Sequence, residues 1–287
     1  MDEILTRSWK QVEQVIAAAL SEDFAHCDVT TEAIIPPDLD GRASILVKAG
    51  GTLAGIEVAR AVFQHIDSEL RVGVLIQDGS RVRSGDIAAT VTGKVASILR
   101  AERTALNFLC HLSGIATETA QYVEAVSGLK ARITDTRKTT PGMRMLEKHA
   151  VRMGGGSNHR LHLCDWVLIK DNHWVALRSL GTGVKEAIEL VRQSSSLKVE
   201  IEVGNIGEAV EALDAGADII MLDNMAVGEM KKMVELARGR TVIEASGGIT
   251  LDNVRQVAET GVDLISIGAI THSTKALDLS LELETGH

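Results

Sequence analysis

Basic side chains gather in one stretch of the chain, residues 135–173, which reads DTRKTTPGMRMLEKHAVRMGGGSNHRLHLCDWVLIKDNH. From residue 137 to residue 170 it holds seven lysines and arginines against two acids, in a protein whose formal net charge is −9. Arginine binds a carboxylate or phosphate through two parallel hydrogen bonds, and lysine binds it as a compact point charge. This local excess of positive charge predicts a site for a small, strongly anionic ligand. Its candidate residues stand at strand ends or beside a glycine-rich turn, and they are Arg137, Lys138, His159, Arg160 and Lys170.

Acidic side chains form a second candidate group. Glu202 ends the apolar run LKVEIEV, and Asp223 ends the run DIIMLD. Glu200 lies two residues before Glu202 and therefore on the same face of its strand. Carboxylates at such strand ends could hold Mg²⁺ or ribose hydroxyls, because hard cations take oxygen ligands. The alternative is that these acids are buried and paired with the lysines of the basic stretch.

Two segments that contain serine and glycine form a third group. In EASGGITLDN a predicted strand is followed by Ser246, Gly247 and Gly248 and then by a predicted helix. Backbone N–H groups in such a turn, together with the start of a helix, attract anions. The segment SIGAITHS has the same form over Ser266, Ile267 and Gly268. Both segments predict a phosphate site, although tight strand-to-helix turns would read in the same way.

Composition excludes several classes of protein. A net charge of −9 and a pI near 5.5 argue against a nucleic-acid-binding protein, which would show a broad basic surface. The three cysteines are widely spaced and form no CxxC pair, which fits reduced thiols. No uncharged run approaches the roughly 18–20 apolar residues of a membrane span, and the first residues lack the apolar core of a secretory signal. We therefore expect a cytoplasmic protein that binds neither nucleic acid nor membrane.

Two kinds of structure are predicted to position these residues. Residues 3–20 place apolar side chains on one helical stripe, and residues 45–100 read as short strands broken by glycine and charged turns. They indicate a small α+β domain, which a long helix starting near residue 101 follows. Beyond that helix, apolar runs alternate with amphipathic helices, which predicts parallel βα units. Polar residues end six successive strands, and this favours a βα barrel over a doubly wound sheet, because a barrel presents its functional residues there.

The chain resembles quinolinate phosphoribosyltransferase (nicotinate-nucleotide pyrophosphorylase, carboxylating) over nearly its whole length. The segments that carry the resemblance are ALSEDF, DVTTEAIIP, VKAGGTLAG, ERTALNFLCHLSGIAT, the 135–173 stretch, VEIEVGN, MLDNM, EASGGIT and SIGAITHS. This resemblance implies an α/β fold with an incomplete, seven-stranded TIM-like βα barrel over residues 115–273. It also implies an N-terminal α+β open-sandwich domain over residues 1–114, which the segment 274–287 rejoins. Head-to-tail homodimers, or hexamers built as trimers of dimers, are the implied assemblies.

The activity that the resemblance implies is phosphoribosyl transfer from phosphoribosyl pyrophosphate to quinolinate with decarboxylation. The products are nicotinate mononucleotide, pyrophosphate and CO₂, as a step of de novo NAD biosynthesis. Mg²⁺ is the implied cofactor, held near Glu202 and Asp223 directly or through water. The implied catalytic residues are Lys138, Lys170, Glu202 and Asp223.

The resemblance also assigns binding roles. Arg137, His159 and Arg160 match the positions that hold the two carboxylates of quinolinate, and Arg103 matches an arginine contributed by the partner subunit. Lys138 and Lys170 match lysines beside quinolinate and the phosphoribosyl donor. The 5-phosphate cradle matches Ser246–Gly248 and Ser266–Gly268. The substrate-binding set is completed by Thr136 and Ile267.

Two alternatives remain open from the residues. The same scaffold could belong to a nicotinate phosphoribosyltransferase or to a molybdenum-transport-associated paralogue. Three arginines, Arg103, Arg137 and Arg160, suit a ligand with two carboxylates better than a ligand with one. A non-catalytic carrier of the lipoyl or biotinyl type is the other alternative, because glycines punctuate the strands of residues 45–100. Lys48 and Lys94 lack the Met-Lys-Met context of such carriers, so the quinolinate transferase is the favoured interpretation.

Overall fold

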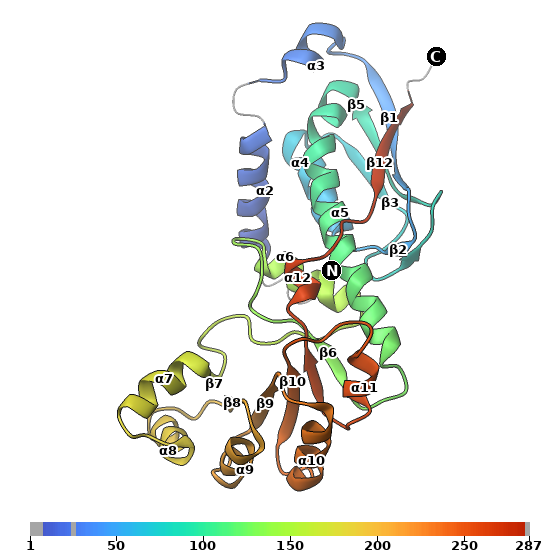
Figure 1. The fold of residues 1–287 in the computed structure, drawn as a ribbon. Coiled ribbons are helices and arrows are strands. Elements are labelled where there is room, and N and C mark those ends of the chain that lie inside the picture. Colours follow the sequence, from blue (N-terminus) through green and yellow to red (C-terminus); the bar gives the residue numbers. More distant parts are fainter. Residues whose placement is uncertain (1–7, 24–26, 285–287) are drawn as a thin grey trace. The chain divides into compact units, whose positions relative to one another are not determined.

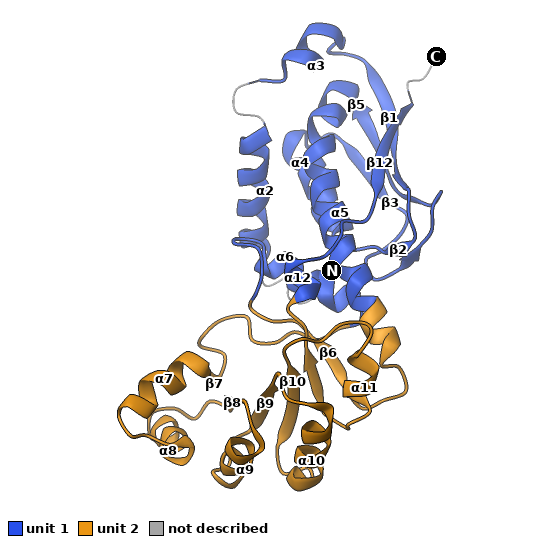
Figure 2. Cartoon of the chain, in the orientation of Figure 1, with its two compact units in different colours: residues 1–120, 138–155, 269–287 blue, residues 121–137, 156–268 orange. Residues whose placement is uncertain are grey.

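A computed structural model describes residues 8–23 and 27–284, and it divides into two compact units (Figure 2). Unit 1 comprises Met1–Ala120, Lys138–Gly155 and Ala269–His287, and unit 2 comprises Gln121–Arg137 and Gly156–Gly268. The chain passes from one unit to the other several times, so each unit is made of more than one segment. None of the helices in the described part of the chain is long and apolar enough to cross a membrane.

Unit 1 is built on an antiparallel sheet of four strands (Figure 1). The C-terminal strand β12 pairs with β1, from Val47 opposite Leu279 to Arg42 opposite Glu284, so the end of the chain completes this sheet. A two-stranded antiparallel ribbon, β2 with β4, lies in the same unit. In sheet order the four strands are β12 (Leu279–Glu284), β1 (Asp40–Val47), β5 (Ile87–Lys94) and β3 (Arg71–Val74), and the ribbon is β2 (Gly51–Thr52) and β4 (Arg81–Val82).

Helices supply most of the remaining core of unit 1. The stripe predicted for residues 3–20 forms α2 (Trp9–Asp23), which buries Val12, Ile16 and Leu20 and packs against α4. The two apolar residues of that stripe at positions 4 and 5 lie outside the described residues. The long helix α5 contains residue 114, where the sequence places a domain boundary. The other helices of the unit are α3 (Val29–Ile34), α4 (Ile56–Ile66), α5 (Val95–Ala125, which runs on into unit 2), α6 (Arg144–Met153) and α12 (Ala269–His272).

Unit 2 is built on a parallel sheet of six strands, and helices alternate with these strands along the chain (Figure 1). This confirms the parallel βα units that the sequence predicts. A further segment pairs with the sheet at one residue only, where Ser157 forms an isolated parallel bridge with Thr134. In sheet order the strands are β6 (Arg132–Thr134), β11 (Leu264–Ser266), β10 (Val242–Ser246), β9 (Ile219–Asp223), β8 (Val199–Val203) and β7 (Val167–Ile169). The helices are α7 (Asp171–Ser179), α8 (Val184–Ser194), α9 (Ile206–Asp214), α10 (Val227–Ala237) and α11 (Val254–Ala258).

The register of this sheet gathers polar side chains on one face. Side chains alternate between the faces of a strand, so Val199, Ile201 and Val203 of β8 share one face, and all three are buried. Glu200 and Glu202 therefore share the other face, as the sequence predicts. Across the neighbouring strands, a single row at the carboxyl ends is formed by Asp223, Ser246, Ser266 and Thr134. The sheet thus aligns side chains that lie far apart in the sequence.

A glycine in α5 marks the close approach of the C-terminal segment. A Cβ added at Gly114 would lie 2.4 Å from the carbonyl oxygen of Lys275, and the nearby Leu277 N–H is tied to the carbonyl oxygen of Cys110 at 3.0 Å. We expect Gly114→Ala to lower the free energy of unfolding by about 1–3 kcal/mol, the usual cost of overpacking. Urea unfolding would measure it. The control is Gly228→Ala in α10, where an added Cβ meets nothing within 4 Å, and equal stabilities of the two variants would contradict the prediction.

Candidate functional site

His159 is held inside unit 2 by side chains from several segments. Its backbone N–H donates to Asp135 Oδ1 at 2.8 Å. Its Nε2 lies 3.1 Å from Glu200 Oε1 and 3.7 Å from Glu244 Oε1. The ring of Trp166 meets the imidazole edge to face, with 4.9 Å between the ring centroids. Both the backbone and the ring of this buried histidine are therefore fixed.

Arg137 and Arg160 place two positive charges where they interact unfavourably. Burial lowers the pKa of Arg160, and the charge of Arg137 lowers it further. Arg160 Nη1 donates to the carbonyl oxygen of Trp166 at 3.0 Å. The Nε atom of each arginine is buried without a hydrogen-bond partner in the part of the chain that the structure describes. Because buried polar atoms are normally satisfied, these two arginines fit acceptor atoms that an anionic ligand would supply.

One lysine and two acids stand at the carboxyl ends of adjacent strands. Lys170 directly follows β7, and its Nζ lies 3.8 Å from Glu202 Oε2 on β8. Burial raises the pKa of Glu202, Lys170 opposes that rise, and Asp223 at the end of β9 adds to it. The Trp174 side chain fixes the end of β8, because its Nε1–H donates to the carbonyl oxygen of Glu202 at 3.0 Å. The three charged groups are thus close enough to act on a common ligand.

The loop after β10 requires glycine. Gly247 and Gly248 have φ values of 86° and 61°, in the left-handed region that glycine tolerates. A Cβ on Gly247 would lie 2.4 Å from Asn224 Oδ1, and Asn224 N–H donates to the carbonyl oxygen of Ser246 at 2.9 Å. The helix predicted after this loop is α11, and it begins at Val254 rather than directly after the glycines. Any anion binding here would depend on backbone N–H groups of the turn rather than on a helix dipole.

The corresponding segment after β11 is tied into the sheet. Ile267 N–H donates to the carbonyl oxygen of Thr134 at 3.0 Å. The hydroxyl of Ser266 donates to Glu244 Oε1, so this side chain points to the buried acids. A phosphate at this segment would therefore meet backbone groups rather than the Ser266 hydroxyl.

Unit 2 contains most of the residues that the sequence predicts for the site. They are Thr136, Arg137, His159, Arg160, Lys170, Glu202, Asp223, Ser246, Gly247, Gly248, Ser266, Ile267 and Gly268. Arg103 and Lys138 belong to unit 1. Arg103 is exposed on α5, and the carbonyl oxygen of Lys138 accepts a hydrogen bond from Thr271 Oγ1 at 2.7 Å.

Three residues that hold His159 and Arg160 are missing from the predicted site: Asp135, Trp166 and Glu244. Glu244 had a usable signal, because it is an acid within an apolar run, two residues before Ser246, as Glu200 is before Glu202. Trp166 shows no such signal, since a tryptophan before an apolar strand reads as a core residue.

Glu244 should make stability depend on pH. Burial raises its pKa to about 7, and the neighbouring Glu200 charge adds to the rise. The folded state then binds more protons at this carboxyl than the unfolded state between about pH 4.5 and pH 7, so its contribution to stability falls as pH rises through that window. We expect Glu244→Gln to lose less stability than the unaltered protein between pH 5 and pH 8. Urea unfolding at both pH values measures this, and an equal loss would contradict it.

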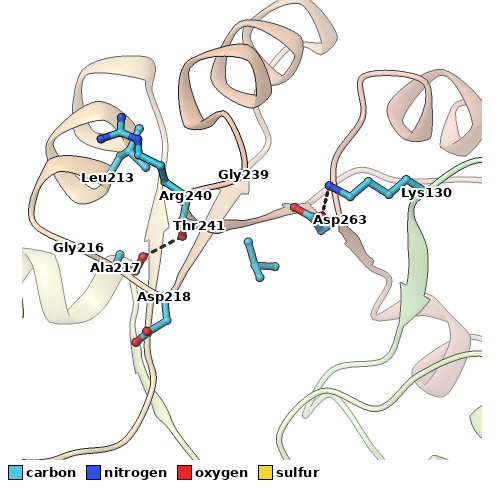
Figure 3. A pocket seen from close by; sticks show the side chains of 10 residues that line it. Lys130, Leu213, Gly216, Ala217, Asp218, Gly239, Arg240, Thr241 and Asp263 are labelled. Atoms are coloured by element: carbon cyan, nitrogen blue, oxygen red, sulfur yellow. Dashed lines mark hydrogen bonds and ion pairs between the residues drawn. The ribbon is translucent and has the colours of Figure 1, made fainter.

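A separate pocket of about 380 Å³ lies at the amino ends of strands in unit 2 (Figure 3). Two pairs of its polar groups are bonded to each other. Lys130 Nζ lies 2.5 Å from Asp263 Oδ1, and Thr241 Oγ1 donates to the carbonyl oxygen of Ala217 at 2.8 Å. In βα folds this end of the strands serves stability, whereas the carboxyl ends serve function. The functional candidates accordingly lie at the other end of the strands.

The fold and the site together define a class of protein. Unit 2 is a parallel α/β sheet that carries cations, acids and left-handed glycines at the carboxyl ends of its strands, an arrangement suited to anionic small molecules. Residues 28–113 match the model of the quinolinate phosphoribosyl transferase N-terminal domain, and residues 115–282 match that of the C-terminal domain. The chain belongs to the quinolinate phosphoribosyltransferase family.

Individual relatives agree with this membership over most or nearly all of their length. The chain is 42% identical to nicotinate-nucleotide pyrophosphorylase (carboxylating) of Mycobacterium leprae, an alignment that covers 93% of this chain and 95% of the relative. It is 41% identical to the mitochondrial quinolinate phosphoribosyltransferase (decarboxylating) 2b of Nicotiana tabacum, over 96% of this chain and 82% of the relative. The crystal structure of NadC from Streptococcus pyogenes superposes with a TM-score of 0.91 at 40% identity, over 96% of this chain and 98% of that structure.

Proposed function

We propose that this chain transfers the phosphoribosyl group of phosphoribosyl pyrophosphate to quinolinate and removes one carboxylate as CO₂. The products are nicotinate mononucleotide, pyrophosphate and CO₂, which places the reaction in de novo NAD biosynthesis. The observation that carries the proposal is the pair Arg137 and Arg160, whose charges interact unfavourably and whose buried Nε atoms have no partner among the described residues. A small ring with two carboxylates would supply both negative charge to offset the two cations and acceptor oxygens for the two Nε–H groups.

Recognition of quinolinate rests on cationic and polar groups. Arg137, His159 and Arg160 would hold its two carboxylates, with Thr136 beside them. Arg103 would come from a second subunit. Once the ring nitrogen is bonded to the ribose, the ring is cationic and accepts the electron pair released when the adjacent carboxylate leaves. No covalent intermediate with the enzyme is needed, and orientation and electrostatics supply most of the rate.

The phosphoribosyl donor would lie over the strand ends of unit 2. Breaking its anomeric bond builds positive charge on the ribose and negative charge on the departing pyrophosphate. Glu202 and Asp223 would stabilise the ribose side, and Lys138 and Lys170 the pyrophosphate side. The backbone N–H groups of Ser246–Gly248 and Ser266–Gly268 would bind the 5-phosphate.

Mg²⁺ fits the acids of this site. Glu202 and Asp223 offer hard oxygen donors at adjacent strand ends, and the raised pKa of Glu202 reflects burial and the nearby Asp223 charge, both of which a cation would offset. Two protein carboxylates leave the remaining positions to water or to oxygens of the donor. When bound, the ion would neutralise the pyrophosphate charge.

The wider architecture follows from the same proposal. We infer that the sheet of unit 2 is an incomplete, seven-stranded βα barrel. The segment at Ser157, which pairs with the sheet at one residue only, would be the seventh strand. The domain boundary after residue 114, the N-terminal open sandwich and a cytoplasmic location remain part of the proposal. Homodimers or hexamers built from dimers would bring Arg103 of one subunit to the site of the next.

A substrate comparison tests the proposed function. The purified protein is assayed with phosphoribosyl pyrophosphate, Mg²⁺ and either quinolinate or nicotinate, and both nicotinate mononucleotide and CO₂ are measured. We expect one CO₂ for each nucleotide formed with quinolinate and no comparable turnover of nicotinate. Efficient turnover of nicotinate alone would support the single-carboxylate alternative and reject the proposal.

A further inference from the structure

A short loop runs from Lys138 to the start of α6, and a tight turn closes it. The Met143 N–H donates to the carbonyl oxygen of Thr140 at 3.0 Å. Between these two residues stand Pro141 and Gly142, and Gly142 has a φ of 81°. This is the pattern of a type II turn, which takes proline at its second position and glycine at its third. The residue before a proline also favours extended backbone, so the end of the loop is set by residue types at successive positions.

Glu147 of α6 holds the middle of this loop from inside the fold. Its side chain is fully buried, and its Oε2 accepts the backbone N–H of Thr140 at 3.1 Å. Its Oε1 lies 2.9 Å from Nε2 of His111 on α5. Burying a carboxylate is costly unless its oxygens are hydrogen-bonded, and here both are engaged. The proposed reaction assigns no role to Glu147, and its contact fixes the backbone two residues after Lys138.

Thr271 holds the same loop at Lys138 itself. It lies on α12, which packs against α6, and its side chain is buried. Its hydroxyl donates to the carbonyl oxygen of Lys138 at 2.7 Å. The backbone after Lys138 is thus fixed at two points, the carbonyl group of Lys138 and the N–H group of Thr140. The loop and both residues that hold it belong to unit 1.

These two contacts bear on chemistry because a lysine side chain is flexible. The ammonium group of Lys138 stands at the end of a four-carbon stem with several rotatable bonds. The fold therefore controls its position chiefly through the direction in which the stem leaves the backbone. Displacing a catalytic group by about 1 Å can cost about a hundredfold in rate, so a fixed backbone at Lys138 has a kinetic value.

We propose that Thr271 and Glu147 are positioning residues for Lys138, which fix the loop backbone and so direct the ammonium group at the departing pyrophosphate. The inference rests on the proposed function, because that function assigns Lys138 to the pyrophosphate. The alternative is that both contacts only stabilise unit 1. Kinetic constants measured beside stability separate the two.

The first test removes the Thr271 hydroxyl in the full-length protein. Thr271→Val keeps the branched shape, and we expect kcat to fall about three- to tenfold, the range for one neutral hydrogen bond. The KM for quinolinate should stay within about twofold, and Thr271→Ser should keep at least about half of kcat. The matched control is Thr260→Val, because the buried Thr260 hydroxyl donates to the carbonyl oxygen of Val257 at 2.6 Å. It loses the same kind of contact, so its kcat should stay within about twofold even where its stability falls.

Glu147 supplies a second pair of variants. Glu147→Met removes both oxygens, and kcat should fall about ten- to a hundredfold, since the lost bond is to a charged group. Glu147→Gln keeps an oxygen for the Thr140 N–H, and a neutral His111 can accept its amide N–H, so kcat should stay within about threefold. Hydrogen exchange followed by mass spectrometry should show faster exchange over residues 138–143 in Glu147→Met than in Glu147→Gln. If Glu147→Met does not fold, Thr271→Val and its controls decide.

A Lys138→Ala background shows whether the effects pass through that lysine. Single turnovers with enzyme in excess measure its slow rate, which Thr271→Val should lower less than about twofold further. A full effect in this background, an unchanged kcat in Thr271→Val, or an equal fall in Thr260→Val would each overturn the inference. A failure of the proposed function differs, because the unaltered protein then makes no nucleotide. In that case an unchanged exchange rate in Glu147→Met would reject the anchoring of the loop as well.

Discussion

Replacing Arg160 with alanine should raise the KM for quinolinate by about thirtyfold or more, because removing one partner of a desolvated charge pair costs about 2–5 kcal/mol. Arg160 is 5% exposed, and its Nε atom has no partner in the described part of the chain. In the alanine variant the substrate carboxylate would therefore lose a buried guanidinium, and water could not easily replace it. Steady-state kinetics with quinolinate varied at saturating phosphoribosyl pyrophosphate would measure it. An unchanged KM would contradict the assignment of Arg160 to a substrate carboxylate.

Two further variants make this result specific. Arg160→Lys keeps the charge but loses the planar fork, so its KM should lie between those of the unaltered protein and Arg160→Ala. Arg132→Ala is the matched control, because Arg132 is an exposed arginine at the start of β6, at the opposite end of a strand from the site. A similar rise for Arg132→Ala would indicate a general effect of net charge rather than a contact.

The sequence was sufficient to predict the strand ends, because local patterns set them. Lys170 follows β7, Glu202 is the last residue but one of β8, and Asp223 and Ser246 end β9 and β10. Apolar runs, segments with the 3.6-residue period of a helix, and the polar residues that end them are local properties of the sequence. They can therefore be recognised without knowing the fold. The parallel order of the strands then follows from their alternation with helices.

The support of His159 could not be predicted in the same way. Its partners Asp135, Trp166, Glu200 and Glu244 are separated by up to 109 positions in the chain, and only the register of the sheet brings them together. Sequence patterns show which face of a strand a residue takes, but not which residue of another strand lies beside it. Glu200 was therefore equally consistent with a structural acid and with a ligand-binding one.

The helix predicted after β10 is present, but a turn separates it from the glycines for a local reason. Gly247 and Gly248 both adopt positive φ, and the Thr250 N–H donates to Asn253 Oδ1 at 2.9 Å. These contacts form a turn that delays α11 to Val254. The glycines indicated a turn correctly, but the side-chain hydrogen bond that lengthens it depends on a rotamer that the sequence does not determine.

Mixing two inactive variants should restore activity if Arg103 acts across a subunit interface. Arg103→Ala and Lys138→Ala should each have little activity alone, because every site then lacks one cationic group. In a mixed dimer, the subunit with intact Lys138 can receive the intact Arg103 of its partner, so one of the two sites is complete. Random exchange in an equal mixture should recover about one quarter of the unaltered activity, given twofold symmetry with both sites at the interface.

The outcome depends on exchange, which must be shown separately by native mass spectrometry of subunits that differ in isotope label. Mixing two separate preparations of Lys138→Ala is the control, since no combination of those subunits completes a site. If mixed dimers form and activity stays at the level of this control, Arg103 does not serve the partner's site. Its exposed position on α5 would then be that of a surface arginine. Recovery to the expected fraction would instead place Arg103 beside Arg137 and Arg160 as a third cation for the two carboxylates of quinolinate.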